Sequence, residues 1–303
     1  MTLSLLLSLG LALAASSLPQ ERAACEPGSF PAHWINGLPD CSAEPDLQVH
    51  AYNPDFYILR ESLCVHYEAP FMFLIFGAEK ALLIDTGSAL TFNLQERVQR
   101  IVNAWKLDNG VNSYELVVVH THGHGDHVGG DAQFAGQPDT TLVAPGVAPN
   151  VQFFGFTNWP NDIVSYDLGG RVLDLIPIPG HEDSSIAFYD RQTCLLMTGD
   201  SLYPGRLYVV GAQAQGQWDV YKASVQRMVD FTASNPVSWI LGCHIEMTQR
   251  PGVDYPFFAP KHPLEHDLQL DLSHLVLLNN TLIAAGNQIQ IYKLRDFIIY
   301  PIN

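Results

Sequence analysis

The feature that most constrains this chain is a loop rich in histidine and glycine, with the sequence HTHGHGDHVGG at residues 120–130. It continues from ELVVVH at residues 115–120, an apolar run that reads as a buried strand. Because alternate residues of an extended loop point to the same side, His122 and His124 can aim their imidazoles at one small object. The glycines let the backbone wrap closely around it. Imidazole and carboxylate groups suit zinc and related divalent ions, which take about four ligands.

Three further segments place a ligand-type residue beside glycine, directly after an apolar strand candidate. They are PGH ending at His181, TGD ending at Asp200 and GCH ending at His244. A single histidine or aspartate at a strand end is more often a cap or a hydrogen-bonded loop residue than a ligand. Together with the histidine-rich loop, these three segments make four such signals in one chain. Four signals instead favour a metal site to which several strand ends contribute.

The hydrophobic pattern favours an α/β fold with its strands in two groups. Short runs rich in branched and aromatic residues predict strands at 56–60, 63–67, 71–76, 81–86 and 115–120, then at 141–145, 172–178, 185–190, 194–200, 237–244 and 289–300. Apolar residues at helical spacing predict helices at 94–105, 218–231 and 266–285. Two groups of strands with helices outside them predict a four-layer αββα sandwich.

We expect three segments along the chain: a signal peptide over 1–15, an N-terminal arm over 16–48 and a single domain over 49–303. The apolar run at 3–15 has the length of a signal-peptide core and is too short to span a bilayer, which takes about 20 residues. The alternative is a hydrophobic N-terminal helix that docks on the domain. The first interpretation predicts a secreted or periplasmic protein, with no stable membrane insertion after processing.

The chain has five cysteines, an odd number that leaves at least one thiol free or tied to another chain. In an exported protein, Cys25 and Cys41 could close a loop across the arm, which has little core of its own. We expect the other three, in or beside strand-like runs, to be small buried hydrophobes: Cys64, Cys194 and Cys243.

The balance of charge excludes one large class of partners. With 31 acidic and 15 basic side chains the formal net charge is −16, so the chain repels phosphate backbones. We therefore expect a small-molecule substrate and no nucleic acid, while the oligomeric state stays open.

The order of these motifs, from LLIDTG around Asp85 through HTHGHGDHVGG, PGH and TGD to GCH, resembles the metallo-β-lactamase superfamily over about 160 residues. The resemblance implies the αββα fold and two divalent metal ions, with zinc as the expected metal. It places His122, His124 and His181 on one metal, and Asp126, His127 and His244 on the second, with Asp200 bridging them. Asp85 resembles the family's early aspartate, which supports the metal loop by hydrogen bonding.

Departures from the family pattern indicate which group of enzymes within the superfamily this chain resembles. Asp200 stands where zinc β-lactamases usually have cysteine or serine, whereas a bridging aspartate is typical of thioesterases of the glyoxalase II type, lactonases and phosphodiesterases. Glu182-Asp183-Ser184 replaces the common Thr-Pro-Gly after His181, so the loop beside the first metal is expected to differ in shape. A diiron oxygen reductase of this superfamily would have glutamate in place of His124, so the resemblance does not extend to that branch.

We therefore expect a metal-dependent hydrolase in which a bridging hydroxide attacks an ester, lactone or thioester carbonyl. Asp126 would orient this nucleophile and accept its proton. Tyr203 follows Asp200 by three residues, a spacing that resembles acyl-homoserine lactonases, in which a tyrosine hydroxyl reaches the substrate carbonyl. The alternative for Tyr203 is an ordinary packed tyrosine.

Two questions about the substrate stay open in the sequence. The aromatic run at 153–160 could wall a pocket for an apolar acyl group or form a satellite core. No basic cluster accompanies it, which argues against glutathione thioesters and phosphodiesters. The alternative functions are β-lactam hydrolysis and a metal-dependent binding protein with little turnover.

Overall fold

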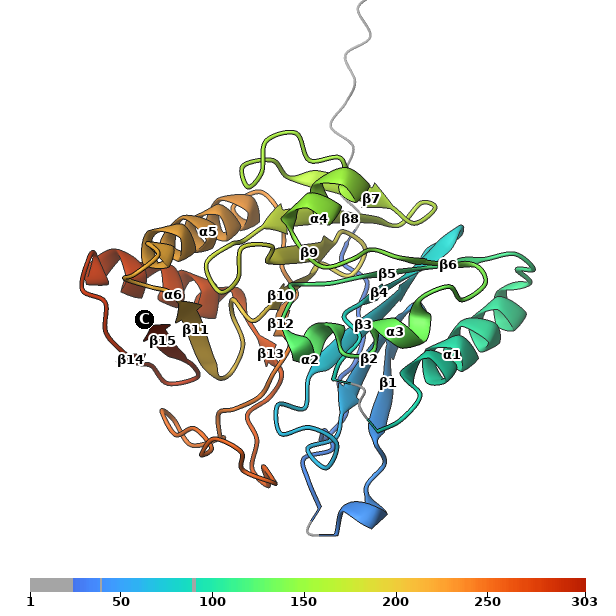
Figure 1. Ribbon diagram of the computed structural model, residues 1–303, viewed down its shortest axis with the longest axis horizontal. Helices are drawn as coiled ribbons and strands as arrows, with labels where there is room; N and C mark the ends of the chain where they lie inside the picture. Colours follow the sequence, from blue (N-terminus) through green and yellow to red (C-terminus); the bar gives the residue numbers. More distant parts are fainter. Residues whose placement is uncertain (1–23, 39, 89–90) are drawn as a thin grey trace, which may run out of the picture.

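A computed structural model describes residues 24–38, 40–88 and 91–303, in which two six-stranded β-sheets form the centre of the molecule (Figure 1). The first sheet has the strand order β1-β2-β3-β4-β5-β6. Its strands are β1 (Leu47–Asn53), β2 (Phe56–Glu61), β3 (Phe71–Phe76), β4 (Lys80–Ile84), β5 (Glu115–Val119) and β6 (Thr140–Leu142). Strands β1 to β4 pair antiparallel, and β5 lies parallel to both β4 and β6.

The second sheet has the order β13-β12-β10-β9-β8-β7 and comes from the second half of the chain. Its strands are β7 (Val164–Asp167), β8 (Val172–Pro177), β9 (Ile186–Asp190), β10 (Leu195–Gly199), β12 (Trp239–Gly242) and β13 (Gln269–Leu270). Strands β10 and β12 are parallel. A smaller third sheet joins β11 (Arg206–Val210), β15 (Ile298–Ile302) and β14 (Tyr292–Lys293).

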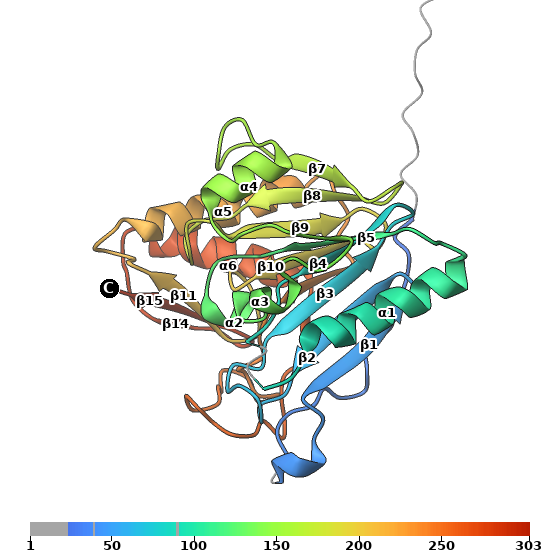
Figure 2. The same cartoon turned by 45° about the vertical axis from the view of Figure 1, so that its right-hand side comes forward.

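Helices cover the outer face of each sheet (Figures 1 and 2). Helix α1 (Leu94–Asn109) lies on the first sheet, and α5 (Gln217–Thr232) and α6 (Leu272–Ala285) lie on the second. The shorter helices are η1 (Cys41–Ala43), α2 (Gly125–Val128), α3 (Asp131–Phe134) and α4 (Val147–Phe154). Helix α1 begins where the Asn93 side chain accepts from the Glu96 amide at 3.0 Å and ends at Gly110, which takes the left-handed conformation.

Three hydrophobic clusters separate the layers. The cluster between the sheets joins residues such as Phe73 of the first sheet and Phe188 of the second. A second cluster buries Val98 of α1, and a third buries Val225 of α5. Because successive residues of a strand face opposite sides, central strands of both sheets are apolar along their whole length. The predicted αββα sandwich is confirmed.

Some predicted elements were wrong in kind or extent. Residues 63–67 form turns instead of a strand, with the Val65 amide bonded back to the Ser62 carbonyl. The helix predicted from 266 begins at Leu272, because Asp271 caps it and the two residues before the cap form β13. The strand predicted over 289–300 is divided into β14 and β15. The pattern also missed β1, β7, β11 and α4.

The loop proposed between Cys25 and Cys41 is wrong. Both cysteines are in disulfides, but Cys25 bonds Cys194 and Cys41 bonds Cys64, so two of the expected buried hydrophobes are half-cystines. The arm runs beside the turn between β9 and β10, where the Glu26 amide donates to the Gln192 carbonyl at 2.7 Å, and this brings Cys25 to Cys194. Only Cys243 remains a free, buried thiol, as the odd count allows.

The proposed signal peptide over 1–15 lies outside the described residues, as does the start of the 16–48 arm. The described part of the arm packs Trp34 into the cluster between the sheets, where its exposed fraction is 8%. Over the ranges that the structure describes, none of the helices combines the length and the apolar character needed to cross a membrane. The division into arm and single domain remains a prediction.

Candidate metal centre

The candidate centre lies where the carboxyl ends of four strands meet. In the first sheet, parallel strands β4 and β5 lead into Asp85 and the loop 120–127. In the second, parallel strands β10 and β12 lead into Asp200 and His244. His181 comes from the loop between β8 and β9. Parallel strands deliver their carboxyl ends to one edge of a sheet, so residues far apart in sequence converge at the mouth of the sandwich.

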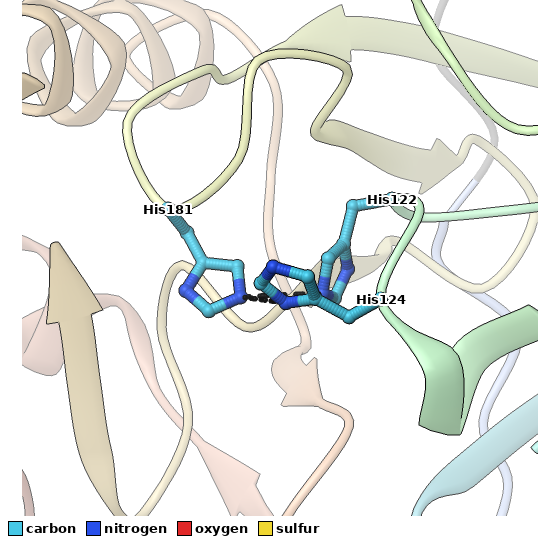
Figure 3. A group of neighbouring side chains, drawn as sticks. All are labelled: His122, His124 and His181. Atoms are coloured by element: carbon cyan, nitrogen blue, oxygen red, sulfur yellow. Dashed lines mark hydrogen bonds between the residues drawn. The ribbon is translucent and has the colours of Figure 1, made fainter. Parts of the chain in front are cut away.

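Three histidines form the first group, which we call the first triad. Figure 3 shows the rings of His122, His124 and His181 pointing their nitrogens at one another. His122 Nε2 lies 3.0 Å from His124 Nδ1 and 3.2 Å from His181 Nε2, and the last two nitrogens are 3.0 Å apart. A tetrahedral zinc ion with Zn–N bonds of about 2.0–2.1 Å would hold its nitrogen ligands about 3.3 Å apart. The first triad therefore has a spacing close to that of a metal site.

The second triad consists of Asp126, His127 and His244. His127 Nε2 and His244 Nε2 are 3.3 Å apart, and Asp126 Oδ2 lies 3.3 Å from each of them. Helix α2 supplies Asp126 and His127 from the first half of the chain, while His244 follows β12. The donor set of two imidazoles and a carboxylate also suits a divalent ion.

Asp200 lies between the two triads. Its Oδ1 is 3.5 Å from His127 Nε2 and 3.3 Å from His244 Nε2, and its Oδ2 is 3.5 Å from His181 Nε2 and 3.9 Å from His122 Nε2. Oδ1 is buried and has no hydrogen-bond partner among the described residues. Its polar neighbours are the His127 and His244 nitrogens just named, so a cation held between these three atoms would satisfy the buried oxygen. The residues present thus fit a pair of divalent ions with Asp200 between them.

The outward nitrogens of three site histidines are held by acceptors. His127 Nδ1 is 2.9 Å from Asp85 Oδ2, His181 Nδ1 donates to the Tyr208 carbonyl at 2.8 Å, and His244 Nδ1 donates to the Glu68 carbonyl at 2.9 Å. A proton fixed on Nδ1 leaves the Nε2 lone pair directed into the site. Side-chain patterns could not have revealed Glu68 and Tyr208, because both act through backbone carbonyls.

Asp85 holds the metal loop from behind. It is fully buried, and its carboxylate accepts from the Thr121 amide at 2.7 Å and from the Thr121 hydroxyl at 2.8 Å, besides contacting His127. Together with Cys243, Asp85 and His127 form a further group with metal-ligand spacing. Burial, with the nearby Asp85 charge, raises the pKa of the Cys243 thiol to about 12, so it stays protonated and is a poor metal ligand. This group therefore fits a supporting role better than a third metal site.

Burial and the neighbouring charges set the protonation of the site. Burial lowers the pKa of His122 and of His181, so both are neutral and able to bind a metal near neutral pH. Burial would also lower the pKa of His127, but the carboxylates of Asp126, Asp200 and Asp85 outweigh it and hold that pKa well above its usual value. The second triad thus favours positive charge at the place where a metal would supply it.

Glycines are required beside two of the site residues. Gly199 precedes Asp200 with φ of +52°, and a Cβ there would lie 2.8 Å from the Thr121 Cβ. Gly180 precedes His181 with φ of +135°, and its Cβ would lie 2.6 Å from the Tyr221 Cα. A side chain at either position would be strained by the backbone conformation and would collide with a neighbouring segment.

Tyr203 and the aromatic run at 153–160 are not members of either triad. The Tyr203 hydroxyl donates to the Arg206 carbonyl, and its buried ring lies 5.5 Å from the His244 ring, an arrangement that favours the packed tyrosine over the oxyanion donor. Of the aromatic run at 153–160, Phe156 is buried in the cluster between the sheets and Phe154 packs against it. This packing favours the satellite core over a pocket wall.

The matching family model is described as the metallo-beta-lactamase superfamily, and it covers residues 68–234, more than half of the chain. The chain belongs to this superfamily. The solved structure of TMB-1 aligns with this chain at 14% sequence identity and a TM-score of 0.50. The alignment covers 80% of this chain and 100% of the TMB-1 chain. At that identity the likeness shows the fold alone.

Two curated relatives match parts of this chain. A hydroxyacylglutathione hydrolase of Aeromonas hydrophila subsp. hydrophila is 33% identical over 135 residues, 43% of this chain and 48% of the relative. The acyl-coenzyme A thioesterase MBLAC2 of Gallus gallus is 24% identical over 206 residues, 58% of this chain and 72% of the relative. The chain therefore spans about half the length of the first of these proteins.

Proposed function

We propose that this protein is a hydrolase that uses two divalent metal ions, with zinc as the expected metal, to cleave a carboxylic ester, lactone or thioester. The observation that carries the proposal is Asp200, whose two carboxylate oxygens face the two triads. The names of the curated relatives, hydroxyacylglutathione hydrolase and acyl-coenzyme A thioesterase, support carbonyl substrates.

When bound, such a pair of ions would lower the pKa of a water molecule from its bulk value toward about 7 and would polarise a substrate carbonyl. The protein's own residues then orient the reactants. Asp126, with 10% of its side chain exposed, lies at the second triad, where it can align the attacking water and accept its proton. Cys243 cannot compete as a nucleophile, because it is buried and its thiol stays protonated.

A substrate panel tests this proposal. Zinc-loaded protein is assayed against lactones, neutral esters, thioesters, a phosphodiester and a cephalosporin, with and without chelator. We expect chelator-sensitive turnover of the carbonyl substrates and its loss in His122→Ala. The matched control is His33→Ala, which removes an exposed histidine far from the site in sequence.

Each remaining outcome identifies a different function. Turnover confined to the cephalosporin would support β-lactam hydrolysis. Two bound ions with no turnover of any substrate would support the metal-dependent binding protein. Turnover that survives removal of all metal would contradict both the proposal and the alternatives.

We also propose that the protein works in an oxidising compartment after export. The disulfides Cys25–Cys194 and Cys41–Cys64 support this, since structural disulfides are rare in reducing cytosol. Expression of the full chain with a C-terminal tag, followed by fractionation and N-terminal sequencing, tests it. We expect an exported product that begins near residue 16, and a cytosolic product that retains Met1 would contradict the proposal.

A further inference from the structure

Tyr203 packs directly against a histidine of the second triad. Its ring lies 5.5 Å from the His244 ring, with an angle of 67° between the two planes, close to the edge-to-face geometry that aromatic pairs prefer. Both side chains are buried, with exposed fractions of 1% for Tyr203 and 5% for His244. The Glu68 carbonyl fixes one nitrogen of this imidazole at 2.9 Å, and packing against the tyrosine ring restricts its rotation.

Two glycines make the space that Tyr203 occupies. A Cβ at Gly205 would collide with the Tyr203 ring, and a Cβ at Gly242 would collide with the Tyr203 Cβ. Neither glycine has a positive φ, so the close approach of the tyrosine, and not the backbone conformation, requires glycine here. Gly242 belongs to the GCH segment that ends at His244. The tyrosine therefore gives a physical reason for the glycine of that motif.

Tyr203 also lies where two segments of the metal centre meet, the one after β10 and the one after β12. The first segment carries Asp200 and the second carries His244. The Pro204 carbonyl, next to the tyrosine, accepts from the Glu246 amide at 2.8 Å and so joins the two segments. The position of the tyrosine ring is thus fixed relative to both ligands.

The hydroxyl of Tyr203 is engaged inside the protein. It donates to the Arg206 carbonyl, and Glu246 Oε2 lies 3.4 Å from it. A phenol has one proton to donate, so a substrate carbonyl would have to replace the Arg206 carbonyl as its partner. The contact that Tyr203 makes with the metal centre is therefore that of its ring.

We propose that Tyr203 is a positioning residue, whose ring holds the His244 imidazole in the orientation that a second metal ion requires and whose hydroxyl takes no part in the reaction. The inference rests on the two-metal site of the proposed function, and it replaces the oxyanion role that the spacing from Asp200 suggested. Ligands held by packed neighbours keep their productive geometry to within about 0.5 Å. Loss of the ring should weaken the second site roughly tenfold, the lower end of the usual effect of residues that orient a metal ligand.

Zinc titration of the metal-free full-length protein, in competition with a chromophoric chelator, tests the proposal without any substrate. The binding step that disappears in His244→Ala identifies the second triad. We expect Tyr203→Leu to weaken that step roughly tenfold and to leave the other step unchanged. Tyr203→Phe should bind zinc as the wild type does, because it keeps the ring. Gly205→Ala keeps the tyrosine but pushes its ring aside, so it should act like Tyr203→Leu.

Tyr189→Leu is the matched control. Tyr189 is also buried, with 2% exposure, and its hydroxyl also donates to a backbone carbonyl, that of Pro236, at 2.7 Å. It lies near the carboxyl end of β9, whereas His181 precedes that strand. Leucine at this position should lower the Tm and leave both zinc steps unchanged. Circular dichroism verifies that each variant is folded.

An unchanged second step in Tyr203→Leu and in Gly205→Ala would overturn the inference, and so would equal weakening of both steps in these variants. If Tyr203→Leu does not fold, Gly205→Ala and Tyr203→Phe still decide the question. A loss of about a hundredfold or more in the kcat of Tyr203→Phe with both ions bound would assign the hydroxyl to catalysis and would also overturn it. A wild type without a second zinc step would contradict both this inference and the proposed function. Zinc steps that respond as expected, in protein that hydrolyses none of the substrates, would contradict the proposed function alone and support the role of Tyr203.

Discussion

Asp126 contributes to the site in a different way from the histidines around it. Its Oδ2 lies 3.3 Å from both His127 Nε2 and His244 Nε2, and the two imidazoles hold its pKa well below the usual range, although burial opposes them. It is therefore a carboxylate at neutral pH and can accept a proton from an attacking water. We expect Asp126→Asn to fold and to lose about 10²- to 10⁴-fold in kcat, the range for a general base. Steady-state kinetics with metal content measured on the same samples checks this, and undiminished turnover would refute the role.

Asp85 is a positioning residue, because it contacts Thr121 and His127 rather than the reacting groups. Asparagine at this position would keep the shape but lose one acceptor oxygen, so His127 Nδ1–H would lack its carboxylate partner. We expect Asp85→Asn to weaken metal affinity by about 10- to 100-fold, the usual effect of removing such a partner. Competition with a chromophoric chelator measures the change. Asp108→Asn, at an exposed position of α1, is the control, and equal affinity in both variants would contradict the role of Asp85.

At the scale of elements, the turn at 62–69 connects the metal centre to the N-terminal arm. Its Glu68 carbonyl holds His244, and its Cys64 is tied to Cys41 at a separation of 23 residues. Closing a loop of that length restricts the unfolded chain and is worth about 3 kcal/mol. We expect the Cys41→Ser, Cys64→Ser double variant to lose about that much free energy of unfolding in urea titrations.

Thiol titration is an independent check on the disulfide pattern. Wild-type protein, unfolded without reductant, should present one reactive thiol, that of Cys243. The double variant should also present one, because its other disulfide joins Cys25 to Cys194. Five reactive thiols in the wild type, or an unchanged stability in the double variant, would contradict this description of the turn.

At the scale of the molecule, the metal centre joins the two halves of the sandwich. The first triad takes His122 and His124 from the loop after β5 and His181 from the second sheet, and the second triad likewise combines α2 with His244. A ligand that binds only the folded state stabilises it by about 2.7 kcal/mol for each site at a concentration of 100 times its Kd. We expect two zinc ions per chain, and a Tm that falls on chelation and recovers with zinc.

Calorimetry together with metal analysis measures both quantities. The double replacement His122→Ala, His181→Ala should abolish most of the shift in Tm from the first triad while leaving one ion bound. A Tm that is insensitive to chelator, in protein that holds no divalent ion, would contradict a metal role for both triads.

The sequence by itself determined the parts of this protein that depend on neighbours along the chain. The spacing of His122 and His124 aims two imidazoles to one side, and strand-end motifs around Asp200 and His244 identify further ligand types. The helical stripe from Leu94 predicted α1, and apolar runs predicted the central strands, because burial on both faces leaves a continuous apolar signal. Weakly apolar edge strands such as β7 carry no such signal and were missed.

Only the tertiary structure decided which distant groups meet. Cys25 forms a disulfide with Cys194 at a sequence separation of 169 residues, and no spacing rule can select this pairing among five cysteines. The Tyr203 hydroxyl donates to the carbonyl of Arg206 at the start of β11, and the carbonyls of Glu68 and Tyr208 orient His244 and His181. Tyr67 and Phe258 meet although 191 positions separate them in the numbering, 258 − 67. Such contacts depend on how the two sheets and their loops pack. Every residue offers the same backbone carbonyl, and only folding brings together side chains that are far apart in the sequence.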